Sequence, residues 1–85
     1  MRYIGIDIAA ETHVLAIVSD EGQILRKPSS FEESAQGYTR LWEWIGSPDG
    51  ALVVMEATGH YWQNLFAALT ARGFAVTLLN PVRTH

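Results

Sequence analysis

The hydrophobic pattern changes its period near residue 30, and this change limits the fold more than any other feature of the chain. Before it, residues 2–10 alternate between apolar and other side chains, which predicts a strand. Residues 12–20 are almost continuously apolar and rich in β-branched types, so we expect a central strand buried on both faces. Residues 20–22 predict a hairpin turn, and a more polar third strand over 23–29 is predicted to end at Pro28. The apolar face of the first strand consists of Ile4, Ile6 and Ile8.

After the change, residues 30–50 carry apolar side chains at helical spacing. Ser30 followed by Glu33 predicts a capping box at the start of this helix. A second helix is predicted over 60–73, with Gly73 as the residue that ends it. The apolar positions of the first helix are Ala35, Tyr38, Leu41, Trp42 and Ile45.

Two further strands, over 51–56 and 74–80, complete the order β-β-β-α-β-α-β. Strands that alternate with helices are joined by parallel crossovers, whereas the first three strands form hairpins. The predicted class is therefore α/β, with a mixed five-stranded sheet. This is the order of elements in the ribonuclease H-like fold.

Composition narrows the class of protein. The 85 residues fit one small domain with a modest core, predicted to span 1–85. The chain has no cysteine, which excludes disulfides and thiolate metal sites, and no apolar run long enough to cross a membrane. The start has no signal-peptide layout, so we expect a cytoplasmic protein. A net charge of −3 argues against a free-standing nucleic-acid binder but is compatible with a carboxylate site that holds cations.

Two acids lie at the ends of predicted strands. Asp7 is near the end of the first strand, and Glu56 ends the fourth directly after an apolar run. Ligands of open α/β sheets bind beyond the carboxyl ends of the strands. If these two strands are neighbours, both carboxylates can hold one Mg²⁺ or Mn²⁺. The structural alternatives are a solvated strand-end aspartate and a glutamate that stabilises the following helix through its dipole.

The residues that follow Glu56 are candidates for contact with a substrate. Thr58 and Gly59 are small enough to leave room for a bulky ligand, and His60 opens the second predicted helix, where it can reach a phosphate. His13 follows the first strand closely, but a histidine on a strand face is more often structural. Trp44 and other aromatic residues are expected to pack on the core, with base stacking as an unspecific alternative. Five further acids are interpreted as turn or solvated helix residues: Asp20, Glu21, Glu32, Glu33 and Glu43.

Three segments together resemble a known family. The stretches "GIDIA-ETH", "MEATGHYW" and "LLNPVRTH" occur in this order and at this approximate spacing in the N-terminal part of DEDD transposases. These are recombinases of the insertion sequence 110 family, related to the Piv DNA invertase. The resemblance covers nearly the whole chain, although the middle helix matches only in general character.

The resemblance implies a RuvC-like catalytic domain that acts on DNA. Four acids of the family bind divalent metal, normally Mg²⁺, and the first two fall on Asp7 and Glu56. It also implies a structured guide RNA that bridges donor and target DNA. Exposed sheet edges in such a fragment favour self-association, so we expect a homo-oligomer. The family's third and fourth acids normally follow the "NP" segment, and its C-terminal domain carries a proposed serine nucleophile. We therefore expect residues 1–85 to be a fragment that is inactive alone.

Two rival functions remain open at this stage. Sugar kinases and actin-like ATPases share the layout and a similar start, but a Gly-rich turn follows their aspartate so that backbone N–H groups can approach phosphate. Here Ala9, Ala10 and Glu11 follow instead, which disfavours nucleotide binding. The other rival is a non-catalytic interaction module that kept the fold.

Overall fold

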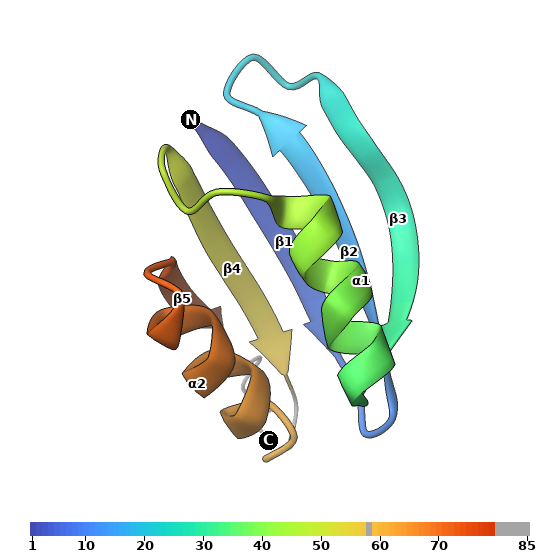
Figure 1. Cartoon of the computed structure of the whole chain (residues 1–85). Helices are drawn as coiled ribbons and strands as arrows, with labels where there is room; N and C mark the ends of the chain where they lie inside the picture. Colours follow the sequence, from blue (N-terminus) through green and yellow to red (C-terminus); the bar gives the residue numbers. More distant parts are fainter. Residues whose placement is uncertain (58, 80–85) are drawn as a thin grey trace, which may run out of the picture.

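The structure, a computed structural model, describes residues 1–57 and 59–79. Its elements follow the order that the periodicity predicts. Figure 1 shows a single sheet with two helices packed against it. The elements are β1 (Arg2–Ile8), β2 (Thr12–Ser19), β3 (Ile24–Glu32), α1 (Ala35–Ile45), β4 (Ala51–Ala57), α2 (Gln63–Ala71) and β5 (Ala75–Leu79).

The strands lie in the order β3-β2-β1-β4-β5. The first three form an antiparallel meander, and β4 and β5 run parallel to β1. β1 is therefore the central strand, with a hairpin partner on one side and a crossover partner on the other. This mixed sheet confirms the predicted ribonuclease H-like class.

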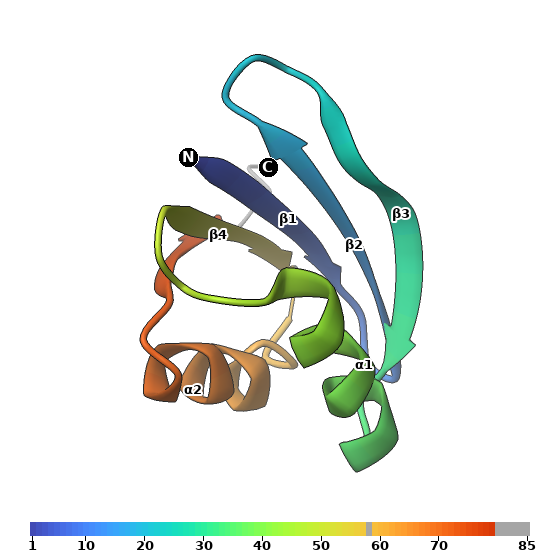
Figure 2. The same ribbon diagram turned by 45° about the horizontal axis from the view of Figure 1, so that its top comes forward.

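Both helices cover the same face of the sheet, as Figure 2 shows. The side chains of alternate strand residues, such as Ile4 and Ile6 of β1, are buried beneath them. Leu41 and Leu65 are buried in the same core from the helix side. The prediction that the second strand is buried on both faces is wrong. Val14 on its other face is 40% exposed, because no helix of the described residues covers that side.

The third strand continues past Pro28, where we expected it to end. Proline is tolerated here for two reasons. β3 is an edge strand, and its register against β2 shifts between the pairs Leu15–Ser29 and Ile17–Arg26, so that Pro28 lies in a bulge. Proline lacks the N–H that a regular ladder position needs, so edges and bulges are where a strand accepts it.

The first helix begins later than predicted, and the capping box of Ser30 and Glu33 is not formed. Ser34 is the N-cap, and its hydroxyl accepts a hydrogen bond from the N–H of Gly37 at 3.0 Å. Residues 30–32 instead extend β3, because the fully buried side chain of Phe31 belongs to the strand side of the core. Burying an aromatic side chain of this size outweighs a local capping preference.

The glycines at the ends of the helices behave as expected. Gly46 and Gly73 have φ values of 63° and 92°, which are left-handed conformations that favour glycine. The second helix is shorter than predicted, since residues 60–62 form a turn before it. β5 closes at Leu79, and the predicted strand end at Asn80 lies outside the described residues. Within residues 1–57 and 59–79, neither helix has the length and apolar character needed to cross a membrane.

Candidate metal site

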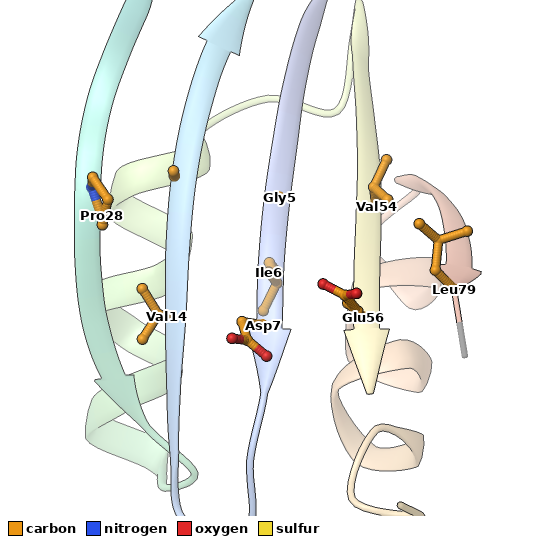
Figure 3. Close-up of a pocket in the computed structure, with 9 residues that line it drawn as sticks. Gly5, Ile6, Asp7, Val14, Pro28, Val54, Glu56 and Leu79 are labelled. Carbon is orange, nitrogen blue, oxygen red and sulfur yellow. The ribbon is translucent and has the colours of Figure 1, made fainter. Parts of the chain in front are cut away.

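Asp7 and Glu56 are direct neighbours across the parallel pair β1 and β4. Each is the penultimate residue of its strand, and parallel strands end at the same edge of a sheet. Ile8 and Ala57, which follow them, are buried against the helices, so the two acids point to the opposite, uncovered face. Figure 3 shows the two carboxylates side by side on that face. The expectation that the first and fourth strands are neighbours is confirmed.

A shallow hollow of about 280 Å³ surrounds the two carboxylates on this face. Its lining residues come from all five strands and, apart from the two acids, are glycine or apolar, as Figure 3 shows. Asp7 and Glu56 are therefore the charged groups of an otherwise apolar hollow. It is lined by Gly5, Ile6, Asp7, Val14, Ala16, Pro28, Val54, Glu56 and Leu79.

The donor set fits one hard divalent cation with an incomplete protein shell. Carboxylate oxygens are the ligands that Mg²⁺ and Mn²⁺ prefer. Within residues 1–57 and 59–79, no group of three or more side chains is placed to hold a metal ion. Mg²⁺ commonly keeps several waters and binds through one or two carboxylates together with substrate phosphates. Asp7 and Glu56 therefore match this kind of site and not an all-protein cage.

Two of the three predicted substrate contacts, Gly59 and His60, do not line this hollow. Thr58 is outside the described residues. Gly59 and His60 form part of the turn between β4 and α2, and His60 is exposed, with its ring 6.0 Å from that of Tyr61. His60 lines a second hollow, together with Ala10, Glu33, Tyr61, Gln63 and Asn64. The structure thus brings the two acids together but does not bring His60 into their hollow.

His13 is fully buried and has two polar partners. Its Nδ1 accepts a hydrogen bond from the N–H of Ala9 at 3.2 Å, and its Nε2 lies 2.6 Å from Oε1 of Glu33. The Nδ1 contact assigns the ring proton to Nε2, which donates to Glu33. The structure therefore supports a structural role for His13 and shows no contact between it and Asp7 or Glu56.

Glu33 was expected to be a helix cap or a solvated acid, and this interpretation is wrong. Its other oxygen, Oε2, accepts a hydrogen bond from the hydroxyl of Tyr38 at 2.8 Å. Partial burial raises the pKa of the Glu33 carboxyl, but hydrogen bonds from His13 and Tyr38 outweigh this and hold the pKa below its usual value. Burial and the Glu33 carboxylate together raise the pKa of Tyr38. Sequence reasoning missed this cluster because its members come from three separate segments: β2, the link between β3 and α1, and α1 itself. The signal that could have pointed to it was Phe31, two residues earlier: a large apolar side chain here favours a strand that continues almost to Glu33.

Trp44 and Trp62 are both partly buried against the core. The Trp44 ring meets Phe31 edge-on at 6.3 Å, and the Arg26 guanidinium lies 4.6 Å from its centre. The Trp62 ring meets Phe66 edge-on at 5.5 Å. These contacts support the expectation that the aromatic residues pack on the core.

Comparison with known protein families gives a match. The family model for the DEDD proteins of insertion sequence 110, described as "Transposase", matches residues 4–85. The match begins within β1 and covers nearly the whole chain, including both acids and the turn that follows Glu56. No curated protein matches the chain.

Proposed function

Because the chain belongs to the DEDD transposase family of insertion sequence 110, we propose that it serves metal-dependent phosphodiester cleavage and strand transfer on DNA through Asp7 and Glu56. The observation that supports this proposal is the pairing of the two acids in the register of β1 and β4. Two like charges held side by side on neighbouring strands repel each other, and a cation bound between them would relieve this repulsion. The open hollow around them gives such a cation access. DNA is the substrate class of the family.

In the proposed site, Asp7 and Glu56 hold Mg²⁺ or Mn²⁺. A bound divalent ion supplies stabilisation of the negative charge that develops on phosphate oxygens during cleavage. The two side chains would hold the cation in a defined position, because the register of the parallel strands sets where the two carboxylates lie. The uncovered face of the sheet gives a phosphate access to them.

Thr58, Gly59 and His60 are proposed to contact the nucleic acid beside the site. Gly59 and His60 follow β4, which carries Glu56, closely in the chain. The exposed rings of His60 and Tyr61 can offer hydrogen bonding and stacking to a nucleic-acid strand that passes the carboxyl ends of the β-strands. Residues 1–85 would form the first part of a RuvC-like catalytic domain, with the family's later acids completing the ligand set. A guide RNA also belongs to this proposal, on the strength of the family resemblance. A homo-oligomer and a cytoplasmic location belong to it as expectations from the sequence.

Manganese titration of the ¹⁵N-labelled chain tests the proposal. We expect paramagnetic broadening of amide signals centred on Asp7 and Glu56. Asp7→Asn and Glu56→Gln should each weaken Mn²⁺ binding by about tenfold or more, or about 1.4 kcal/mol. Glu21→Gln, in an exposed turn, is the matched control and should bind as the wild-type chain does.

In the absence of metal, Asp7→Asn and Glu56→Gln should each be slightly more stable than the wild-type chain. Removal of one of two like charges on neighbouring strands is expected to raise stability by about 0.5 kcal/mol, which raises Tm by about 2–4 °C. Broadening spread over Glu21, Glu32 and Glu43, with the strand ends unaffected, would contradict the site and favour a non-catalytic module.

A further inference from the structure

The loop that follows Asp7 is held by hydrogen bonds that converge on one residue. This loop, residues 9–11, joins β1 to β2, and Figure 1 shows it beside the N-terminal end of α1. At its start, the N–H of Ala9 donates to Nδ1 of His13, whose Nε2 lies 2.6 Å from Glu33. At its end, the carbonyl of Glu11 accepts a hydrogen bond from the backbone N–H of Glu33 at 2.8 Å. Both ends of the loop are therefore fixed, directly or through His13, to Glu33.

The polar pair of the buried His13 and the partly buried Glu33 is not needed to fill the core. His13 is fully buried, and its ring lies 5.1 Å from that of Phe31 in an apolar environment. An apolar side chain of similar shape would satisfy packing here at comparable or lower free energy. What an apolar side chain cannot do is hold the N–H of Ala9. The polar pair thus gives directional control of the loop after Asp7, which packing alone does not give.

Glu33 also connects this loop to the helices. Tyr38 of α1 donates to it at 2.8 Å, and the Asn64 side chain of α2 helps to lower its pKa. α2 follows Glu56 in the chain, across the turn of residues 59–62. The Glu33 carboxylate therefore lies between the segments that follow the two acids, on the helix-covered side of the sheet.

We propose that His13 and Glu33 are positioning residues that hold the strand end of Asp7 at the place where it shares a cation with Glu56. The inference rests on the proposed function, since it concerns the same site. His13 acts only through the loop backbone and touches neither acid. Groups bonded directly to the ligands of a metal typically change its affinity by about 10–100-fold when removed, and for a group that acts through the backbone we expect the lower end of this range.

His13→Phe is the central test, because it keeps a ring in the core and removes both hydrogen bonds. We expect the variant to remain folded, with Mn²⁺ affinity at Asp7 and Glu56 reduced by about tenfold. The amide of Ala9 should exchange with solvent at least about tenfold faster, a readout that does not depend on metal. His13→Asn, whose side-chain oxygen can still accept from Ala9, should recover part of the affinity.

Tyr38→Phe is the matched control, since it removes a hydrogen bond to Glu33 but leaves the loop bonds in place. It should keep wild-type Mn²⁺ affinity even if it lowers stability. A folded His13→Phe variant that binds Mn²⁺ within about twofold of wild type would overturn the inference, as would equal losses in His13→Phe and Tyr38→Phe. If His13→Phe does not fold, Glu33→Ala is the second variant, because the Glu33 side chain lies partly at the surface. It leaves the His13 ring without the partner that orients it towards Ala9, so we expect a smaller loss of Mn²⁺ affinity, and a folded Glu33→Ala chain with wild-type affinity would overturn the inference.

Failure of the proposed function has a different signature. In that case the wild-type chain itself shows no Mn²⁺ binding at the strand ends, and both proposals fall together. Binding in the wild-type chain with unchanged binding in His13→Phe contradicts the positioning role alone.

Discussion

At the scale of single residues, Glu33 shows how position and not residue type decides the role of an acid. Its sequence neighbours suggested a helix cap, yet its carboxylate accepts hydrogen bonds from a strand residue and a helix residue. These donors stabilise the charged form, which is why its pKa lies below the usual value despite partial burial. The carboxylate thus links stability to pH.

Because the pKa of Glu33 is lowered in the folded chain, protonation of this carboxyl favours the unfolded state. A carboxyl group whose pKa is lower in the folded state stabilises the fold above its unfolded pKa, near the usual value of 4.5. The stabilisation is lost as pH falls below 4.5 through the folded pKa. We expect Glu33→Gln to be less stable than wild type at neutral pH, with a difference that shrinks in acid. Urea unfolding of both chains as a function of pH measures this difference, and a difference that is constant down to acid pH would contradict it.

Gly37 is a second residue whose role depends on its surroundings. It lies in the first turn of α1 and is buried. A Cβ at this position would overlap the backbone carbonyl oxygen of Glu32, which is the last residue of β3. The close approach of the strand end to the helix therefore requires a residue without a side chain.

Gly37→Ala should destabilise the chain, although alanine is the better helix former by about 1 kcal/mol. The overlap involves backbone that cannot move aside easily, and overpacking costs about 1–3 kcal/mol or more. Gln36→Ala, at the exposed neighbouring position of the same helix, should change stability by no more than about 0.5 kcal/mol. Thermal unfolding compares the two variants. Stabilisation by Gly37→Ala would mean that the strand end and the helix lie further apart than the structure shows.

At the scale of elements, the boundary between β3 and α1 was decided by competition. Local preference favours a helix from Ser30, but burial of Phe31 extends the strand and moves the cap to Ser34. The other end of α1 is stabilised from a distant element. The guanidinium of Arg2, in β1, donates to the carbonyl of Ile45 at 2.7 Å and also to that of Ser47. This contact satisfies carbonyl groups that a helix end leaves without partners.

The two serines offer a direct test of the boundary. Ser34→Ala removes the cap and should cost about 1 kcal/mol, which lowers Tm by about 4–8 °C. Ser30→Ala, the same change at an exposed position of the edge strand, should alter stability by at most about 0.5 kcal/mol. A larger loss of stability in Ser30→Ala than in Ser34→Ala would mean that the helix begins at Ser30, as the capping box predicts.

At the scale of the whole molecule, the sheet has one covered and one uncovered face. The helices bury one set of alternate strand residues, and the uncovered face carries Asp7, Glu56 and the apolar floor between the strands (Figures 2 and 3). The separation leaves the candidate site open to a large substrate. It also concentrates the stability of the described residues in a single layer of core.

Adjacent residues of β4 should therefore respond very differently to the same truncation. Met55 is fully buried, whereas Val54 faces the open side. Met55→Ala is expected to cost about 2–5 kcal/mol, a large part of the 5–15 kcal/mol that a domain of ordinary stability has. Val54→Ala should cost no more than about 1 kcal/mol. Urea unfolding measures both, and similar losses would indicate that the second face is also packed.

The sequence by itself determined the elements and the facing of their side chains, because periods of 2 and 3.6 are local properties of the chain. It therefore predicted the β-β-β-α-β-α-β order and the two strand-end acids as candidates. Only the tertiary structure decided that Asp7 and Glu56 share a register position, since strand pairing depends on contacts between distant segments. The same holds for the partners of Glu33 and for the extension of β3 past Pro28. At the boundary between β3 and α1, the burial of Phe31 outweighed a local capping preference of about 1 kcal/mol.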